Sequence, residues 1–315
     1  MTPEMFANSQ RVRFALVKLL CHGRVSISVI DKADYPYNST NKMFRADCRA
    51  LGASFDTVEA LAQRGIASKI HSPPSCALSG TIQRQCITSI AEDCGLRQPL
   101  LLVSSVDRAN LQHVQIRYTQ NMSRKKWFSE VAVLALATCG GDSMLIYALT
   151  KKDVQAIAKH IGTILRLAGD DRPVIAIHGG DEISFAEKRR LVALFRGRPS
   201  ILVTNSAGAR GLDHPKLLRV VKSAVPTSLN ERVQVDGRGA RLSDQRATVT
   251  QLYLRKFLFS TASIIRDDDE KLAAFTDVIA VEEALRHCAR SLVRFFYGEI
   301  AAPHNAQCRN TCCPS

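Results

Sequence analysis

The chain has 315 residues, 46% of them hydrophobic, which is enough for a buried core in two α/β layers with a small appended region. Its 43 Lys and Arg against 29 Asp and Glu give a net charge of +14, which favours a polyanionic partner, although many basic proteins carry only solvated Lys and Arg faces. No apolar run approaches the length of a membrane span and no secretory signal is recognisable, so these patterns argue against a membrane protein and a secreted one.

The ten cysteines also bear on the cellular compartment. In a chain without a secretory signal, cysteines are typically reduced thiols or metal ligands and not a disulfide framework. We therefore expect an intracellular protein, nuclear if its source is eukaryotic.

The first predicted elements in chain order are a helix and a strand. Residues 5–20 look helical, and residues 24–30 form a predicted strand that ends at Asp31, followed by Lys32. Ligands of α/β folds lie at the carboxyl ends of strands, so Asp31 is a candidate magnesium ligand. The polar segment 117–129 has no clear periodicity and is predicted to be a linker with the start of a second lobe.

The second half alternates between strands and helices. Predicted strands cover residues 144–148, 174–178 and 201–204, with helices at 153–167 and 184–195 between them. Ser184 and Glu187 have the spacing of a capping box. Strands separated by helices predict a parallel, doubly wound sheet. After residue 254 the pattern is helical, with an acidic helix start at 267–270 and a helix over 281–297.

One pair of segments carries most of the functional signal. An apolar strand at 201–204 leads into a turn rich in small residues, and Gln234-Val-Asp-Gly-Arg-Gly-Ala-Arg241 follows thirty residues later. Arg238 and Arg241 are three apart, so we expect them on one helical face, where guanidinium groups bind phosphate oxygens bidentately. The simpler interpretation is an exposed polar loop after a strand.

Several segments match the motifs of one family in the same order. They are Thr2-Pro3-Glu4, Asp31-Lys-Ala-Asp34, Phe44-Arg-Ala-Asp-Cys-Arg-Ala-Leu-Gly52, Leu78-Ser-Gly-Thr81, Asp107-Arg-Ala-Asn-Leu111 and Gln234 to Arg241. With these the chain resembles the RecQ family of superfamily 2 DNA helicases. RecQ-like genes near fungal telomeres are often fragmentary in this manner, which favours a fungal telomere-linked member.

The resemblance implies a fold class and an activity. We expect an α/β protein with a partial first RecA-like lobe at residues 1–116 and a second RecA-like parallel-sheet lobe at 117–255. A small helical zinc-binding-like tail would follow at 256–315. The family activity is ATP-dependent 3′–5′ unwinding of DNA, with ATP and Mg²⁺ as cofactors. The expected partner is single-stranded or junction DNA, with no membrane.

The first lobe departs from the family pattern. By resemblance Asp31 would hold magnesium through water, but the adjacent catalytic glutamate is replaced by Lys32, whose charged amine cannot act as a base. No Gly-x-x-x-x-Gly-Lys-Ser/Thr loop, which cradles the phosphates in such motors, occurs in the chain. The chain therefore resembles a motor truncated at its front, and we expect no ATP hydrolysis by this chain alone.

The second lobe keeps more of the family's residues. By resemblance Arg241 is the arginine finger, with Arg238 and Gln234 beside it and Asp213 on the nucleotide side. Asn205 and Arg210 stand where the family contacts the DNA backbone. An asparagine amide can still donate to a phosphate, so the DNA contact is expected to survive.

The tail resembles the family's zinc-binding subdomain. Cys288 precedes Arg294-Phe-Phe-Tyr-Gly-Glu299, and three further cysteines follow: Cys308, Cys312 and Cys313. Four thiolates suit tetrahedral zinc, but adjacent Cys312 and Cys313 depart from the family spacing. Zinc binding and free thiols both stay open.

Two other functional classes stay open beside the helicase hypothesis. One is a non-catalytic DNA-binding remnant that uses the basic second lobe. The other is a decaying gene fragment, whose incomplete first lobe would expose apolar surface and need a partner chain to supply or cover the missing part.

Overall fold

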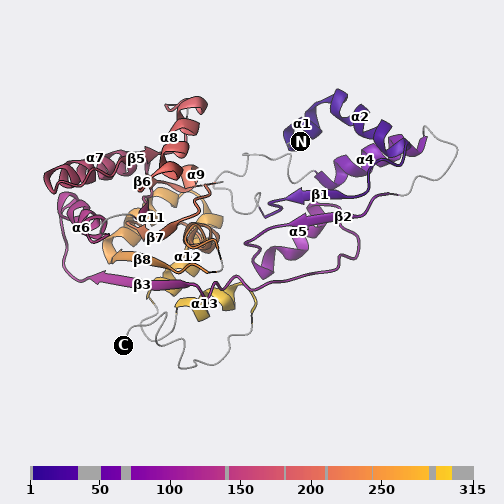
Figure 1. The fold of residues 1–315 in the computed structure, drawn as a ribbon. Helices are drawn as coiled ribbons and strands as arrows, with labels where there is room; N and C mark the ends of the chain where they lie inside the picture. Colours follow the sequence, from indigo (N-terminus) through magenta and orange to yellow (C-terminus); the bar gives the residue numbers. More distant parts are fainter. Residues whose placement is uncertain are drawn as a thin grey trace. The chain divides into compact units, whose positions relative to one another are not determined.

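The computed structural model describes residues 3–34, 51–64, 72–138, 142–180, 182–209, 212–242, 244–283 and 289–299. The chain forms two compact units, Met1–Val106 and Asp107–Ser315 (Figure 1). Among the residues described, no helix is both long and apolar enough to cross a bilayer.

The first unit is a small parallel pair of strands with helices. Its elements are α1 (Pro3–Asn8), α2 (Gln10–Cys21), β1 (Ser28–Asp31), α4 (Leu51–Arg64), β2 (Ser75–Leu78), the 3-10 helix η2 (Arg84–Cys86) and α5 (Ile87–Asp93). β1 pairs in parallel with β2. Phe6, Val58 and Ala62 are fully buried and form the centre of a core between α1, α2 and α4. This core is small, as expected for a unit with so little sheet.

The predicted first helix is divided in two, and the predicted strand is shortened. Ser9 separates α1 from α2, because its hydroxyl accepts a hydrogen bond from the Val12 N–H at 3.4 Å and caps the second helix. The strand predicted over residues 24–30 starts later, at Ser28, and ends at Asp31.

The second unit contains a six-stranded sheet in which every pair is parallel. The strands are β3 (Leu111–Tyr118), β4 (Ser143–Tyr147), β5 (Val174–Ile177), β6 (Ile201–Thr204), β7 (Leu217–Lys222) and β8 (Ala247–Leu254). Their spatial order is β3-β8-β7-β4-β6-β5. The predicted parallel, doubly wound α/β sheet is confirmed. All five residues of β4 are buried, which fits a central strand covered on both faces.

Helices cover both faces of this sheet (Figure 1). α6 (Arg124–Leu136) and α7 (Lys151–Leu167) pack on one face, and α8 (Phe185–Gly197) and α10 (Leu229–Asp236) pack on the other. α6 begins inside the segment that was predicted to be a linker. Trp127 and Phe128 in its first turns are 2% and 9% exposed, so they belong to the core.

Helix starts follow the capping rules of the sequence. The Ser184 hydroxyl accepts a hydrogen bond from the Glu187 N–H at 3.1 Å, as the capping-box spacing predicts. The Thr150 hydroxyl does the same for the Asp153 N–H, also at 3.1 Å, so α7 begins two residues before its predicted start.

The tail helices belong to the second unit. α11 (Arg255–Ile265), α12 (Asp269–Glu283) and α13 (Ala289–Phe296) share a core with Val225, Leu229 and Tyr253. Within the helix predicted over residues 281–297, residues 281–283 belong to α12 and residues 289–296 to α13, while residues 284–288 lie outside the described residues. The first unit ends earlier than the predicted boundary after residue 116, because β3 pairs with β8 along its whole length.

Candidate nucleotide and nucleic-acid sites

The two arginines of the strongest motif lie in a loop at the amino ends of β7 and β8. We call residues 237–242 the arginine loop. α10 ends at Asp236, and Gly237 follows as its cap. Ala240 donates its N–H to the carbonyl of Leu217, the first residue of β7, at 2.8 Å. The prediction that Arg238 and Arg241 share a helical face is therefore wrong, since both follow the helix.

The arginine loop has a strained backbone that is held from a distant part of the chain. Ala240 has a φ of 43°, in the left-handed region that side chains other than glycine rarely adopt. Arg108 donates from Nη1 to the Gly237 carbonyl at 2.8 Å and from Nη2 to the Ala240 carbonyl. Asn110 Nδ2 also donates to Ala240, at 2.8 Å. Two side chains thus fix the carbonyls on either side of Arg238 and Gly239.

A tail helix in turn holds the segment that carries Arg108. Arg290 of α13 lies with Nε 2.9 Å from Asp107 Oδ1, and its Nη2 donates to the Leu111 carbonyl. Both side chains are mostly buried, at 12% and 21% exposure. The motif at residues 107–111 signalled this region in the sequence, but nothing in the sequence indicated that Arg290 is its partner.

The two arginines of the loop differ in their surroundings. Arg241 is 37% exposed and lies with Nη1 2.9 Å from Asp213 Oδ1. Arg238 donates from Nη1 to the Leu212 carbonyl at 2.9 Å, while its Nε is buried without a hydrogen-bond partner. Burial, followed by repulsion from Arg241, lowers the pKa of Arg238 to about 10, so it stays charged at neutral pH. A cationic donor left unsatisfied beside a second, accessible guanidinium is suited to bind an anion.

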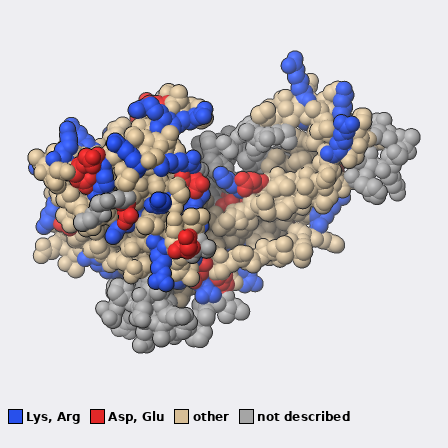
Figure 2. All heavy atoms as spheres, in the orientation of Figure 1, with Lys and Arg blue, Asp and Glu red and all other residues tan. Residues whose placement is uncertain are grey.

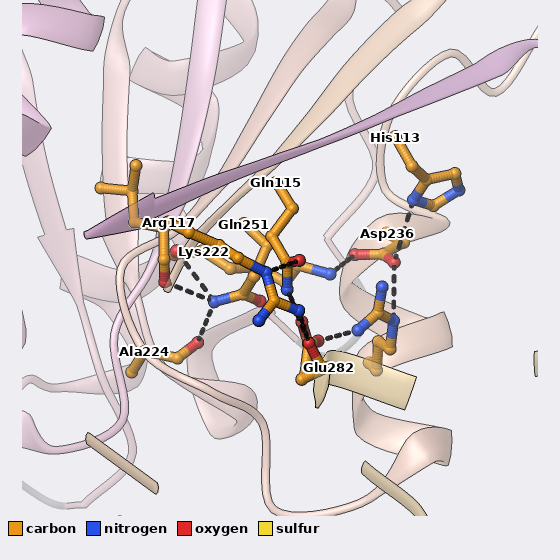
Figure 3. A network of polar contacts seen from close by, with 10 residues as sticks. His113, Gln115, Arg117, Lys222, Ala224, Asp236, Gln251 and Glu282 are labelled. Carbon is orange, nitrogen blue, oxygen red and sulfur yellow. Dashed lines mark hydrogen bonds and ion pairs between the residues drawn. The ribbon is translucent and has the colours of Figure 1, made fainter. Parts of the chain in front are cut away.

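The helix before the arginine loop is anchored by a group of charged side chains inside the unit (Figure 3). We call Lys222, Arg232, Asp236 and Glu282 the buried ion cluster; all four are at most 5% exposed. Lys222 Nζ lies 2.7 Å from Asp236 Oδ1, and Arg232 pairs with Glu282. The four formal charges cancel. Because Asp236 is the last residue of α10, its ion pair fixes the end of the helix from which the arginine loop departs.

Burial shifts the ionisation of this group. The pKa of Lys222 falls to about 8, chiefly through burial and then through repulsion from Arg232. Burial likewise lowers the pKa of His113, next to Asp236, to about 4. Burial alone would raise the pKa of Asp236, but the nearby cations, Lys222 first, outweigh it, so that pKa is lowered. Asp236 is therefore charged at neutral pH, while His113 is neutral.

Polar side chains of β3 and β8 surround the buried ion cluster (Figure 3). Gln115 donates from Nε2 to Glu282 Oε2 at 2.7 Å, and Arg117 donates to the Glu282 carbonyl. Gln251 Nε2 donates to the Ala224 carbonyl at 3.3 Å. α12 is thereby tied to the sheet edge by hydrogen bonds as well as by ion pairs.

The first unit contains the acidic turn that was predicted to hold magnesium. Asp31 is exposed at the end of β1, and Lys32 follows it with a φ of 57°. Asp34 is 4% exposed, and its Oδ2 accepts a hydrogen bond from the Thr81 hydroxyl at 2.7 Å. The acidic turn and the Ser79-Gly-Thr81 motif are thus physically connected. The exposed carboxylate of Asp31 could bind a magnesium ion that is also held by nucleotide phosphates, whereas the ammonium of Lys32 cannot be a metal ligand.

Asn205 follows the carboxyl end of β6, whereas the arginine loop lies at the amino ends of β7 and β8. Its Oδ1 accepts hydrogen bonds from the Gly179 N–H at 3.3 Å and the Gly208 N–H at 3.2 Å. Position 208 requires a glycine, because a Cβ there would lie 2.3 Å from Thr204 Oγ1 and 2.6 Å from the Ile177 carbonyl oxygen. With Oδ1 engaged, the amide nitrogen of Asn205 is the group that can donate to a phosphate.

Other residues near this end of the sheet have structural or surface roles. His178 is 2% exposed, with Nδ1 3.0 Å from the Gly179 carbonyl oxygen, and so has the position of a structural residue. Lys151 is exposed and lies 3.3 Å from Glu182 Oε1. Lys and Arg outnumber Asp and Glu on the face of the second unit that Figure 2 displays.

The remaining predicted site residues lie outside the described residues. These are Arg210 and the four proposed zinc ligands, Cys288, Cys308, Cys312 and Cys313. Within the described part of the chain no group of three or more His, Cys, Asp or Glu residues is placed to hold a metal ion. Gln234 lies on α10, two residues before its end.

Known proteins share the fold of this chain. Residues 129–243 match the family described as Helicase conserved C-terminal domain. The ATP-dependent helicase SGS1 of Saccharomyces cerevisiae is 22% identical over 308 residues, which cover 95% of this chain and 19% of that protein. This chain therefore spans about a fifth of the length of that relative.

Solved helicase structures are also similar. The DUF1998 helicase MrfA bound to DNA has a TM-score of 0.62 at 15% identity, covering 93% of this chain and 38% of that one. The DEAD-box helicase Mss116 bound to ssRNA and UDP-BeF has a TM-score of 0.55 at 15% identity, covering 91% and 62%. Dbp5 of S. cerevisiae, bound to RNA and ADP BeF3, has a TM-score of 0.52 at 17% identity, covering 90% and 68%. Residues 129–243 are therefore similar to a helicase C-terminal domain, and the chain shares its fold with these helicases of known structure.

Proposed function

We propose that this chain is part of a RecQ-type DNA motor in which the second unit contacts nucleotide phosphates with the arginine loop and the DNA backbone with Asn205. The observation that carries the proposal is the construction of the arginine loop. A strained backbone, fixed by Arg108 and Asn110, holds an accessible Arg241 beside a buried, unsatisfied Arg238 Nε. Such a fixed pair of guanidinium groups is suited to stabilise phosphoryl charge.

The proposed nucleotide contacts have distinct roles. Arg241, the more exposed arginine, is the proposed arginine finger, and Arg238 is its neighbour inside the loop. Asp213, now paired with Arg241, and Gln234 on α10 would flank the phosphates. ATP with Mg²⁺, when bound, would supply the phosphoryl group whose negative charge these arginines neutralise.

The proposed DNA contact is at the carboxyl end of β6. Asn205 Oδ1 is engaged with the backbone of two glycines, so its amide nitrogen is the donor for a DNA phosphate. By the sequence resemblance, Arg210 is a second proposed contact with the DNA backbone. MrfA, whose structure contains DNA, is one of the similar helicases, and the net charge of +14 favours such a partner.

We further propose that this chain alone does not hydrolyse ATP. Lys32 follows Asp31 where a motor of this kind needs a carboxylate base, and no phosphate-cradling Gly-x-x-x-x-Gly-Lys loop occurs in the sequence. A DNA-binding remnant without motor activity is the alternative, and a decaying fungal telomere-linked helicase gene would be one origin for it.

We also propose that a partner chain covers an exposed apolar surface of the first unit. Leu100, Leu101, Leu102 and Val103 are 85%, 55%, 85% and 67% exposed, in one unbroken apolar run. Exposed apolar runs of this kind are typical of surfaces that pack against another segment. Zinc bound by the tail cysteines also stays a proposal, which metal analysis of the purified chain would test.

DNA binding is tested with two substitutions of Asn205. Asn205→Asp keeps an oxygen that accepts from Gly179 and Gly208 but removes the donor and adds a negative charge, whereas Asn205→Ala removes both functions. Fluorescence anisotropy with a labelled single-stranded oligonucleotide should show salt-dependent binding that weakens about ten-fold or more in Asn205→Asp at unchanged thermal stability. Binding of Asn205→Asp equal to that of the unmodified chain would refute the contact.

The absence of hydrolysis is tested separately. ATP turnover by the chain, with and without the oligonucleotide, should be indistinguishable from that of Arg241→Ala. DNA-stimulated turnover that disappears in Arg241→Ala would show that the chain is an active motor despite Lys32.

A further inference from the structure

A pocket of about 400 Å³ lies in the second unit at the carboxyl ends of two neighbouring strands. Its floor is formed by Leu149 and Thr150, which follow β4, and by Ser223 and Ala224, which follow β7. The first turns of α6 and α7 and one side of α11 complete it. Neither Asn205 nor the arginine loop lines this pocket, so the proposed function leaves it without a role.

The topology of the sheet makes this position significant. β4 continues into α7 on one face of the sheet, whereas β7 continues into α10 on the other face. β4 and β7 are adjacent and parallel, so their connections diverge at their carboxyl ends. In open α/β sheets this topological switch point is where ligands bind.

The pocket combines aromatic and cationic side chains. Its aromatic wall presents the half-buried ring of Phe257, which contacts the ring of Trp127; Trp127 and Phe128 line the same wall but are themselves buried in the core. Hydroxyl groups are contributed by residues 150, 223, 260 and 261. Among the charged side chains that line it, three are cations and one is an anion: Arg124, Lys152, Lys256 and Asp153. Asp153 is already paired with Arg124. A net positive charge beside an aromatic wall favours a ligand with a planar ring and an anionic group.

Helix ends strengthen the attraction for an anion. α6, α7 and α11 all begin at the pocket, so the positive ends of three helix dipoles meet there. Ser123 and Thr150 cap α6 and α7, but Leu254 at the start of α11 offers no side-chain acceptor. The first-turn N–H groups of α11 are therefore able to donate to a phosphate, next to the Lys256 ammonium, which uses one of its three hydrogens to bond the Met122 carbonyl.

We propose that this pocket binds one nucleotide, with the nucleobase against the aromatic wall and the phosphate at Lys152, Lys256 and the start of α11. The volume lies within the range of pockets for small ligands, about 300–1,000 Å³. The nucleotide is either a free mononucleotide or the terminal nucleotide of a strand. The site is separate from the proposed backbone contact at Asn205 and does not depend on it.

The single tryptophan of the chain provides the reporter, because Trp127 lines the pocket. Adenosine 5′-monophosphate should change its fluorescence saturably, with a dissociation constant below about 1 mM, and adenosine or inorganic phosphate should bind at least about ten-fold more weakly. A 5′-phosphorylated oligonucleotide that saturates the signal where the mononucleotide does not would identify a strand end as the source. No saturable change with any probe, or equal binding of adenosine and the monophosphate, would overturn the proposal.

Two matched pairs of variants locate the binding. Ser260→Phe fills the pocket from an exposed position of α11, and Ser263→Phe places the same ring on the same helix outside the pocket. Lys152→Gln removes a lining cation of α7, and Lys159→Gln removes an exposed one farther along that helix. Only Ser260→Phe and Lys152→Gln should weaken binding, the first by about ten-fold or more. Unchanged binding in both, at unchanged thermal stability, would contradict the assignment.

Discussion

Removing one carboxylate from the buried ion cluster should destabilise the second unit strongly. The side chain of Glu282 is 1% exposed and that of its partner Arg232 is 5% exposed. In Glu282→Gln the cluster of Lys222, Arg232 and Asp236 would carry a net positive charge inside the protein. Arg232 would keep only Asp236, 3.8 Å away, which already pairs with Lys222. Breaking such a buried pair typically costs about 3–5 kcal/mol.

The neighbouring residue is the matched control. Glu283 is 33% exposed, lies 3.8 Å from both Arg255 and Arg117, and accepts a hydrogen bond from the Tyr253 hydroxyl. A glutamine can still accept that hydrogen bond, so Glu283→Gln should cost about 1 kcal/mol or less. Replacing both members of the buried pair, in Arg232→Met/Glu282→Leu, removes one charge of each sign. This double variant should therefore be more stable than Glu282→Gln alone.

The assay is urea unfolding of the full chain followed by the fluorescence of Trp127. This residue is 2% exposed in the core of the second unit, so its signal reports that unit and not the first. If Glu282→Gln and Glu283→Gln unfold with the same free energy, the cluster is not electrostatically coupled in the way that its geometry indicates. A double variant less stable than Glu282→Gln would contradict the charge-balance argument.

Three further predictions concern other parts of the second unit. The pKa of His113 lies at about 4 instead of 6.5, so the unfolded chain binds the proton first and stability falls as pH drops from 6.5 towards 4. His113→Gln should reduce this loss between pH 7 and 5, and a pH slope equal to that of the unmodified chain would refute the argument. Gly208→Ala should destabilise the second unit by about 2 kcal/mol or more in thermal melting, because the added Cβ would lie 2.6 Å from the Ile177 carbonyl oxygen. Gly197→Ala, where the added Cβ would meet no atom within 4 Å, should be neutral or stabilising in the same experiment. Arg108→Lys should speed hydrogen exchange of the Ala240 amide, since a lysine cannot bond both carbonyls of the arginine loop, and the exposed Arg246→Lys should leave that exchange rate unchanged.

The sheet of the second unit could be predicted because its signals are local. Residues 174–177 and 201–204 are short apolar runs between turn residues, and Ser184 caps a helix from three residues away. β3 was missed although its polar and apolar residues alternate from His113 to Tyr118, because polar residues that face the buried ion cluster look like the solvated residues of a linker in the sequence.

The arginines of the candidate site were proposed from the sequence, whereas their geometry could not be. Arg238 and Arg241 were singled out by type and spacing, yet Gly237 ends the helix before them, and this glycine was the available signal for a loop. Lys222 and Glu282 are 60 residues apart and each resembles a solvated surface charge in the sequence. Long-range pairing of this kind depends on the topology, so it could not be inferred from local patterns.

The clamp on the arginine loop also has a consequence for the order of folding. Arg108 and Ala240 are separated by 132 residues, and the edge strand β3 pairs only with β8, near the end of the sheet's sequence. During synthesis β3 must therefore remain without its partner until nearly the whole unit has emerged. Pairings of such separation form late and slowly, because the loop-closure entropy is lost before any contact is gained. The residues proposed to meet the nucleotide would be among the last to reach their final positions, so a nascent or partly folded chain cannot display them.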